Sequence, residues 1–530
     1  MSEGAQAQAD SGIGRERLIV LGGLMLGMLL GSIDQSIVST ALPRIAGDLG
    51  GFNKISWVVT AYLVTVTVTT PLYGKLSDIY GRAKIFETAI AIFLLGSVLS
   101  GVAQNMNQLA LFRALQGVGA GGLIAMATTI LGDIFSPRER GKYMSYMMLI
   151  FGAATIGGPL LGGYLTDHYT WRWVFYINVP IGALAILIIH STLDLPIPGD
   201  AHRIDYEGAA LLVGAVGSLM LMTTWGGNEY AWDSTVILGL AAAAVVLGVA
   251  FVLQERRVDE PVFPVHLLGI RTVSGVIVLS FCLGIGMFGA TIYLPVFLQT
   301  VLGVSATNSG LLLLPLVGGM LVTAALTGQL MTRTGRYKAF PVLGTALAAV
   351  GYYLLSTMGP ATTHFHSTAY MVVTGMGLGF VMPVLTVAIQ NAVSRKSLGV
   401  ATTSVTFSRS LGSAIGVAVF GALLTNQLTS RLNDAFPGAG EKFASSGAGL
   451  GPEKIQALPP AIRDTVVAAL ANSIDVVFLA GMGVLLVALV VAVVLPELEL
   501  DETAHVSVGG EGVVETAPEA GEGGGAPAED

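Results

Sequence analysis

The chain is poor in cysteine and in charge. Cys282 is the only cysteine among 530 residues, which excludes an intrachain disulfide and a metal site built from several cysteines. Charged residues make up 11% of the chain, against about 25% in soluble domains. This scarcity excludes an ordinary soluble protein. With 53% hydrophobic residues, the composition instead predicts a chain that lies in a lipid bilayer.

Sequence motifs of common enzyme classes are also missing. The chain has no phosphate-binding GxxxxGK[ST] loop and no HExxH zinc motif. Its seven histidines cluster only at His364 and His366, whose spacing in an expected outer loop is a weak metal signal. We therefore expect no enzyme, no metal, no cofactor and no nucleic-acid partner.

Apolar runs of about 20 residues, long enough to cross the hydrocarbon core, occur fourteen times. They begin near Leu18, Ser56, Ile85, Gln108, Tyr143, Trp173, Glu207, Thr235, Thr272, Ser309, Tyr337, Thr368, Val400 and Asn472. The pattern predicts an all-α polytopic membrane protein with 14 transmembrane helices and both termini on one side. The loops on that side hold 17 lysines and arginines and the opposite loops hold seven, so the positive-inside rule predicts cytoplasmic termini.

An internal repeat divides the spans into two halves. GKLSDIYGRAKIF from Gly74 and GQLMTRTGRYKAF from Gly328 align without gaps, which equates spans one to six with nine to fourteen. Spans seven and eight are then an insertion. The expected divisions are a cytoplasmic arm (1–17), a six-helix bundle (18–195), two inserted helices (196–258), a second six-helix bundle (259–496) with an external segment (430–471), and a disordered acidic cytoplasmic tail (497–530).

Asp34 lies deeper in an apolar segment than any other carboxylate of the chain. An ionised acid in hydrocarbon costs about 2.5–3.5 kcal/mol on insertion scales, so the side chain must be protonated, paired or reached by water. Arg113 lies at a comparable depth in its own span. We expect this pair to couple proton binding to transport. The alternative is a satisfied ion pair that only holds two helices together.

A charge cluster is expected at the cytoplasmic surface. Gly74, Asp78, Gly81 and Arg82, with Asp133 at the inner end of the fourth span, are expected to latch the outward-facing state. In the second copy of the repeat Thr332 stands where Asp78 stands in the first, so such a latch should be lopsided. The alternative is that the basic residues only set the orientation and bind anionic lipids.

The fifth span carries small residues that favour close helix contact, and a proline that removes a backbone donor. The pattern predicts either a hinge or ordinary helix packing. Its residues are Gly152, Gly157, Gly158, Pro159, Gly162 and Gly163.

Acids are absent from Pro261 through Asn433, although Arg409 lies inside a span of that stretch. Arg409 is expected either to attract an anionic group or to bond backbone carbonyls. Asp475 begins the last span, where a solvated acid at the outer surface is expected. Both residues are candidates for substrate contact or gating. The segment before Asp475 has an amphipathic pattern typical of a surface helix, a gate or an inert connector.

Several of these motifs resemble those of the major facilitator superfamily. GKLSDIYGRAK is similar to its cytoplasmic-loop signature, RALQGVGAGG from Arg113 to its fourth-span signature, and GAATIGGPLLGG from Gly152 to the fifth-span motif associated with antiporters. SIDQSIVSTALP and WRWVFYINVPIG resemble segments of the fourteen-span drug:proton antiporters of the EmrB/QacA kind. The resemblance covers about residues 15–500 and implies a major facilitator fold, with two six-helix bundles plus two inserted helices.

The resemblance also implies a function. We expect a proton-coupled antiporter that exports amphipathic, cationic drugs or toxic compounds by alternating access. Its expected partners are a small-molecule substrate, protons and the lipid bilayer, and the expected form is a monomer in the inner (plasma) membrane. The alternatives are a dedicated exporter of an endogenous lipid, siderophore or antibiotic, and a non-transporting membrane sensor or scaffold.

Overall fold

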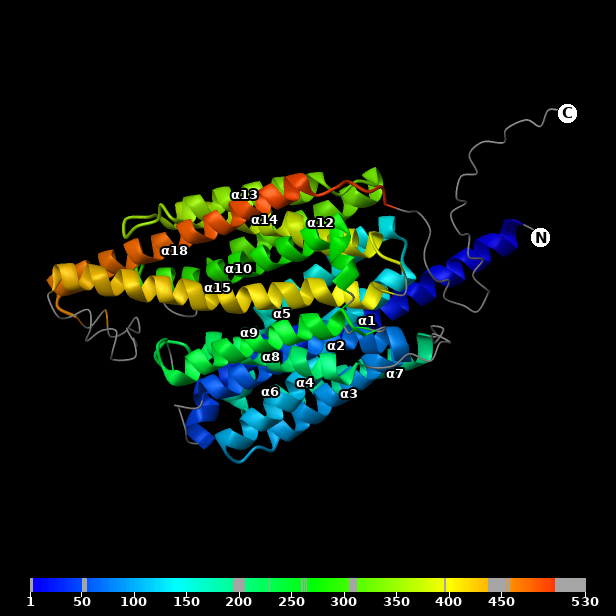
Figure 1. The fold of residues 1–530 in the computed structure, drawn as a ribbon, viewed down its shortest axis with the longest axis horizontal. Coiled ribbons are helices and arrows are strands. Elements are labelled where there is room, and N and C mark those ends of the chain that lie inside the picture. The colour runs from blue at the N-terminus through cyan, green and yellow to red at the C-terminus, as the bar shows by residue number, and fades with distance from the viewer. Residues whose placement is uncertain are drawn as a thin grey trace.

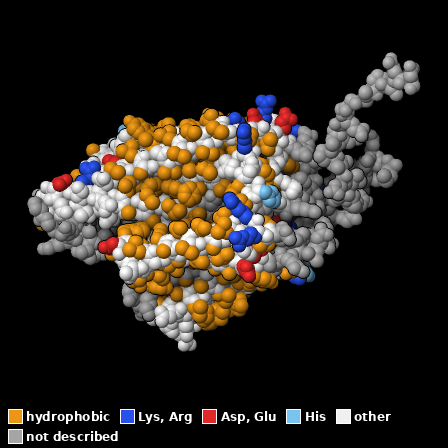
Figure 2. Space-filling model, in the orientation of Figure 1, with side chains coloured by type: hydrophobic (Ala, Val, Ile, Leu, Met, Phe, Trp, Pro, Cys, Tyr) orange, Lys and Arg blue, Asp and Glu red, His pale blue; other side chains and the backbone are white. Residues whose placement is uncertain are grey.

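The computed structural model describes residues 3–49, 55–193, 205–227, 229–258, 261, 263, 265–304, 312–394, 397–436, 455 and 458–500. Long helices dominate these residues and run side by side (Figure 1). Hydrophobic side chains cover the middle of one face and charged side chains lie towards its two ends (Figure 2). The expected all-α, membrane-spanning class is confirmed.

The first part of the chain supplies α1 (Glu3–Leu49), α2 (Ile55–Tyr80), α3 (Arg82–Gly101), α4 (Met106–Ile134), α5 (Pro137–His168), α6 (Trp173–Tyr176) and α7 (Asn178–Thr192). A pair follows, formed by α8 (Tyr206–Trp225) and α9 (Thr235–Glu255). The short η2 (Val265–Gly269) leads into α10 (Arg271–Thr300), α12 (Leu314–Thr334), α13 (Ala339–Leu355), α14 (His364–Asn391), α15 (Leu398–Ala435) and α18 (Pro460–Val494). We call the end at which α1 begins and α2 and α12 finish the inner end.

Helix packing follows the internal repeat. In the first part α4 packs on α2 and α3, and α1 packs on α5 and α7. In the second part α14 packs on α12 and α13, and α10 packs on α15 and α18. The two parts meet at two junctions, α2 with α15 and α5 with α12. Helix α8 contacts both α2 and α15, so the inserted pair covers the first junction. The division into two six-helix bundles and an insertion remains our interpretation.

The number of spans stays a prediction. Twelve helices among the described residues are long and apolar enough to cross a membrane. Helices α2 and α13 occupy the places of the second and eleventh expected spans but are not among the twelve. Helix α13 has only 17 residues, and five threonines interrupt the apolar sequence of α2.

Two helices extend beyond the spans expected from the sequence. The polar residues 3–17 form a helix that continues into the first span, whose apolar part begins at Arg17, so the expected arm stays a prediction. The last helix begins at Pro460 rather than near Asn472, because Pro460 suits a first helical turn and no later residue breaks the amphipathic pattern. The amphipathic segment is therefore continuous with the last helix, and the external segment 430–471 stays a prediction. Residues 437–454 and the acidic tail from 501 lie outside the described residues.

Glycines at equivalent places in the two copies of the repeat share an unusual backbone. Gly81 has φ of 92° and Gly335 has φ of 66°, and each lies just beyond the helix that carries its repeat, α2 or α12. A side chain at either position would be strained, because left-handed backbone is unfavourable for residues with a Cβ atom. The two copies of the repeat therefore share a glycine with positive φ, although ψ is 145° at Gly81 and 10° at Gly335.

Candidate functional site

Asp34 lies fully buried on α1 and binds three side chains. Arg113 Nη1 of α4 donates to Asp34 Oδ2 at 2.6 Å, and Gln116 Nε2, one helical turn further along α4, donates to Oδ1 at 2.8 Å. Asn178 Nδ2 of α7 also donates to Oδ1, at 3.1 Å. This arrangement suits an ionised carboxylate, because both oxygens accept hydrogen bonds and a cation lies against one of them.

Neighbouring helices hold these three donors in place. The Arg113 guanidinium lies 4.0 Å from the centre of the Tyr62 ring of α2, and its Nη1 also donates to Gln116 Oε1 at 2.8 Å. Asn178 Nδ2 donates to Ser97 Oγ of α3 at 3.0 Å. Within the described residues, Arg113 Nε and Asn178 Oδ1 are buried without a hydrogen-bond partner. A change in the charge of Asp34 can therefore affect five helices (α1, α2, α3, α4 and α7). Arg113 and Asn178 each have one polar atom left that can form a further hydrogen bond.

Sequence reasoning located only part of this network. The expected proximity of Asp34 and Arg113 is observed. Gln116 was missed, although it follows Arg113 by three residues and so shares its helix face. Asn178 was missed too; its signal was an amide inside the apolar segment VFYINVPIG. No pattern in the sequence pointed to Tyr62.

Glycines of α5 bring that helix against α1 beside the buried acid. A methyl group on Gly158 would overlap Ser36, and one on Gly162 would lie 2.7 Å from the backbone oxygen of Ile37. On another face, a methyl group on Gly152 would lie 2.5 Å from Leu321 of α12. Close contact with α1 thus requires Gly158 and Gly162, whereas the end of the Leu321 side chain can shift to admit a methyl group at Gly152.

The remaining members of the fifth-span motif differ. Gly157 and Gly163 face open space, since a methyl group there would meet no atom within 4 Å. Pro159 lies inside α5 and leaves one helix hydrogen bond unmade. Whether the motif works as a hinge stays a prediction.

Gly158→Ala should reduce uphill export by about tenfold, because the added methyl pushes α1 at a point two residues from Asp34, and overpacking of this kind costs about 1–3 kcal/mol. Gly157→Ala is the matched control, with equal helix chemistry and no new contact. Export of a fluorescent amphiphile from proteoliposomes, at equal amounts of folded protein, measures both. Equal activity of the two variants would argue against a role for the α1–α5 contact.

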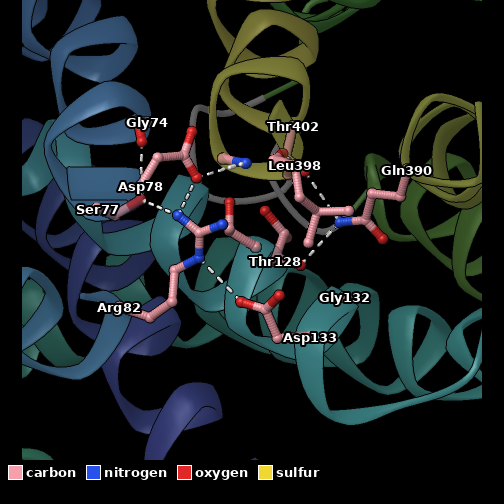
Figure 3. Close-up of polar contacts among 12 residues, drawn as sticks. Gly74, Ser77, Asp78, Arg82, Thr128, Gly132, Asp133, Gln390, Leu398 and Thr402 are labelled. Carbon is pink, nitrogen blue, oxygen red and sulfur yellow. Dashed lines mark hydrogen bonds and ion pairs between the residues drawn. The ribbon is translucent and has the colours of Figure 1, made fainter. Parts of the chain in front are cut away.

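Arg82 lies at the centre of a charge cluster at the inner end (Figure 3). Its Nε donates to Asp133 Oδ2 of α4 at 2.9 Å, and its Nη1 donates to Ser77 Oγ at 2.8 Å and to Asp78. All of these side chains are largely buried. The structure thus brings the expected cluster of Asp78, Arg82 and Asp133 together. The sequence predicted only that the three side chains lie at the same membrane surface.

Asp78 also connects the first half to the second. Its Oδ1 and Oδ2 accept the backbone N–H groups of Gly399 and Val400, both at 3.2 Å, in the first turn of α15. A carboxylate there interacts favourably with unpaired amides and with the positive end of the helix dipole. Gly74 permits this approach, since a methyl group on it would lie 2.9 Å from Gly399 O and overlap Thr403. The sequence could not predict this partner.

The second junction uses opposite chemistry. Arg138, in the first turn of α5, donates from Nε to Thr332 O at 2.7 Å and from Nη2 to Arg333 O at 3.3 Å, in the last turn of α12. A cation at a helix C-terminus is favourable for the same dipolar reason. Gly328 is the counterpart of Gly74 and lies against Gly141 of α5. The first junction thus uses an acid, Asp78, and the second uses a base, Arg138. This difference agrees with the replacement of Asp78 by Thr332 in the second copy of the repeat. The sequence did not point to Arg138.

Gln390 of α14 makes a third contact between the halves. Its Nε2 donates to Thr128 O of α4 at 3.0 Å and to Thr402 Oγ1 of α15 at 3.1 Å (Figure 3). All three residues are buried. The inner end is therefore closed by polar contacts across both halves.

The two remaining candidates lie elsewhere. Arg409 is half-buried in α15, and its side chain makes no hydrogen bond or ion pair within the part of the chain that the structure describes. Asp475 lies fifteen residues into α18 and is half-buried, with Arg431 of α15 near enough to act on it electrostatically. Its expected position at the outer surface stays a prediction, because the start of a helix does not mark the boundary of the membrane. No group of three His, Cys, Asp or Glu side chains within the described residues could hold a metal ion.

Comparison with known proteins gives consistent matches. The sequence profile of the Major Facilitator Superfamily matches residues 24–417. Multidrug transporter protein MdtP of Bacillus subtilis (strain 168) is 35% identical over 509 residues, covering 92% of this chain and 94% of MdtP. Multidrug resistance protein 3 of the same strain is 36% identical over 500 residues, covering 93% and 97%. The crystal structure of the human organic anion transporter MFSD10 (TETRAN) gives a TM-score of 0.62 at 15% identity, covering 90% and 99%, so it shows a common fold alone.

Proposed function

The chain belongs to the major facilitator superfamily, and from this premise we propose that it is a proton-coupled exporter of amphipathic compounds. The expected major facilitator fold is confirmed by the family match and the structural likeness. The chain is thus a multi-span membrane protein of a transporter family whose Bacillus relatives are named as multidrug transporters. We propose no enzymatic activity for it.

The observation that carries the proton-coupling proposal is the buried Asp34 network. Both carboxylate oxygens accept hydrogen bonds from side chains of α4 and α7. Adding a proton to Asp34 removes its charge and weakens the 2.6 Å contact with Arg113. Because α5 packs against α1 beside this site, a local change of charge can alter how the helices of the first half fit together.

The cluster at the inner end is proposed to latch one conformation. Opening that end requires Asp78 to leave the first turn of α15, and Arg138 to leave the last turn of α12. In each contact a charged side chain of the first half binds backbone groups at the end of a helix of the second half. Such a contact can form again after it breaks without needing a particular side chain on the second half. This supports alternating access in which proton binding at Asp34 and release of the inner contacts occur in one cycle.

We further propose that the protein works as a monomer in the inner (plasma) membrane, with both termini in the cytoplasm. The charge distribution among the loops supports this orientation. Export of cationic compounds was expected because Asp34 is the one deep carboxylate. Since Arg113 already occupies that carboxylate, a cation would bind there only by displacing the arginine or after it has moved.

The proposed function is tested with purified protein in proteoliposomes under an imposed pH gradient. We expect accumulation of cationic, neutral or anionic fluorescent amphiphiles against their own gradient, and collapse of this accumulation when a protonophore is added. A panel with all three charge types also measures substrate breadth. Transport that continues unchanged after the pH gradient is removed would contradict proton coupling.

A further inference from the structure

Arg409 is a charged side chain in the protein interior without a protein counter-charge. The helices α10 and α14, which pack on α15, hold no Asp or Glu, because the chain has none from Pro261 through Asn433. The other helices that contact α15 (α2, α4, α8 and α18) carry acids, but none of these forms an ion pair with Arg409 among the described residues. Within the described residues the guanidinium of Arg409 takes part in no hydrogen bond or ion pair. The bonding to backbone carbonyls that the sequence left open is therefore not observed there.

The helix register places Arg409 on the face of α15 that looks towards the first half. Arg409 follows Thr402 by seven residues, or about two turns, so the two side chains leave α15 on the same side. Thr402 accepts from Gln390, whose amide also reaches the Thr128 carbonyl of α4 (Figure 3). Arg409 thus lies about 10 Å further from the inner end than this contact, along the boundary between the two halves.

Two features indicate that space remains beside the guanidinium. Arg409 retains accessible surface, although Thr402 and Ser413 on the same face are buried. It lies eleven residues into α15, about 16 Å from the inner end of that helix, which is near the middle of a bilayer core of about 30 Å. A cation at this depth is costly unless another group compensates for its charge.

Within the described ranges, Arg409 is therefore the charged side chain at this depth that the protein leaves uncompensated, whereas Asp475 has Arg431 near it. Asp34 and Arg113 compensate each other at 2.6 Å, while Arg409 is left over. We propose that Arg409 binds the anionic group of an amphipathic organic anion, such as a carboxylate or sulfonate attached to an apolar body. The planar guanidinium can hold such a group with two parallel hydrogen bonds. This inference rests on the proposed export function and names the substrate class of its binding site.

Binding of three probes that share one apolar fluorescent body tests the proposal. One probe ends in a carboxylate, one in a neutral amide and one in a quaternary ammonium, and each is titrated against purified protein in a zwitterionic detergent. We expect the carboxylate to bind at least about tenfold more tightly than the amide, as a charge-assisted bidentate contact would give. Arg409→Gln should remove this preference and leave amide binding unchanged, while Arg409→Lys should keep part of it.

Arg336→Gln is the matched control, because Arg336 is exposed just after α12 and lies outside the candidate site. It should bind all three probes as the wild type does. The proposal is overturned if Arg409→Gln keeps the preference for the carboxylate, or if it weakens all three probes equally while remaining folded. These titrations use no pH gradient, so their result does not depend on whether transport is coupled to protons. Uphill export of the amide probe by Arg409→Gln would separately show that the exporter function is intact.

Discussion

Asp34→Asn should lower uphill, proton-driven export by at least about 100-fold while leaving exchange of substrate between the two sides intact. An amide cannot take up a proton at this position, so the coupling step is lost, and the loss of a positioned acid or base is typically of this size. The same side-chain shape still fills the space between α1, α4 and α7. Uphill accumulation and substrate exchange, measured in the same proteoliposomes, separate coupling from folding.

A second variant distinguishes proton coupling from a purely structural ion pair. Asp34→Asn alone leaves Arg113 buried without its counter-charge, and breaking a buried pair in this way costs about 3–5 kcal/mol. Asp34→Asn combined with Arg113→Gln removes both charges, so thermal stability should recover. Under the proposed function the double variant stays uncoupled. If it regains uphill export together with stability, the pair has only a structural role.

Asp78→Asn should shift the protein towards a state that is open at the inner end and should slow turnover by more than about tenfold. The variant removes a carboxylate from the first turn of α15 and from the buried contact with Arg82, which together are worth roughly 2–4 kcal/mol. Substrate affinity should change less than turnover, because this cluster lies far from the middle of the membrane. The distance between spin labels at the exposed positions Tyr80 and Ser394, in a Cys282→Ser background, reports opening.

Lys84→Gln is the matched control for the latch. Lys84 belongs to the same repeat and is exposed, so it tests whether positive charge at this surface matters only for orientation or for anionic lipids. We expect label distances and turnover close to those of the wild type. Equal effects of Lys84→Gln and Asp78→Asn would favour the lipid interpretation and remove the latch.

The sequence predicted the fold class because hydropathy and loop charge are properties of contiguous segments. It also predicted the repeat, and the paired glycines Gly81 and Gly335 both have positive φ in the structure. The proximity of Asp34 and Arg113 could be anticipated because two depths along antiparallel helices can be compared from residue counts alone.

Contacts between helices that are distant in the sequence could not be predicted in this way. Asp78 binds backbone amides of α15, and Arg138 binds backbone carbonyls of α12; backbone groups carry no sequence signal. The boundaries of α18 were missed for a different reason. A count of about 20 residues finds one span within a helix of 35 residues, and it left outside that span the turns from Pro460 to Ala471, which contain Arg463 and Asp464.

The central claim is that the charge of Asp34 changes during the transport cycle. Infrared difference spectra of the purified protein, taken as wild type minus Asp34→Asn across a pH titration with and without substrate, measure this carboxyl group directly. The account predicts a protonated carboxyl band that appears as pH falls and whose midpoint shifts when substrate binds. A band that stays present, or stays absent, under every condition in which transport occurs would contradict it.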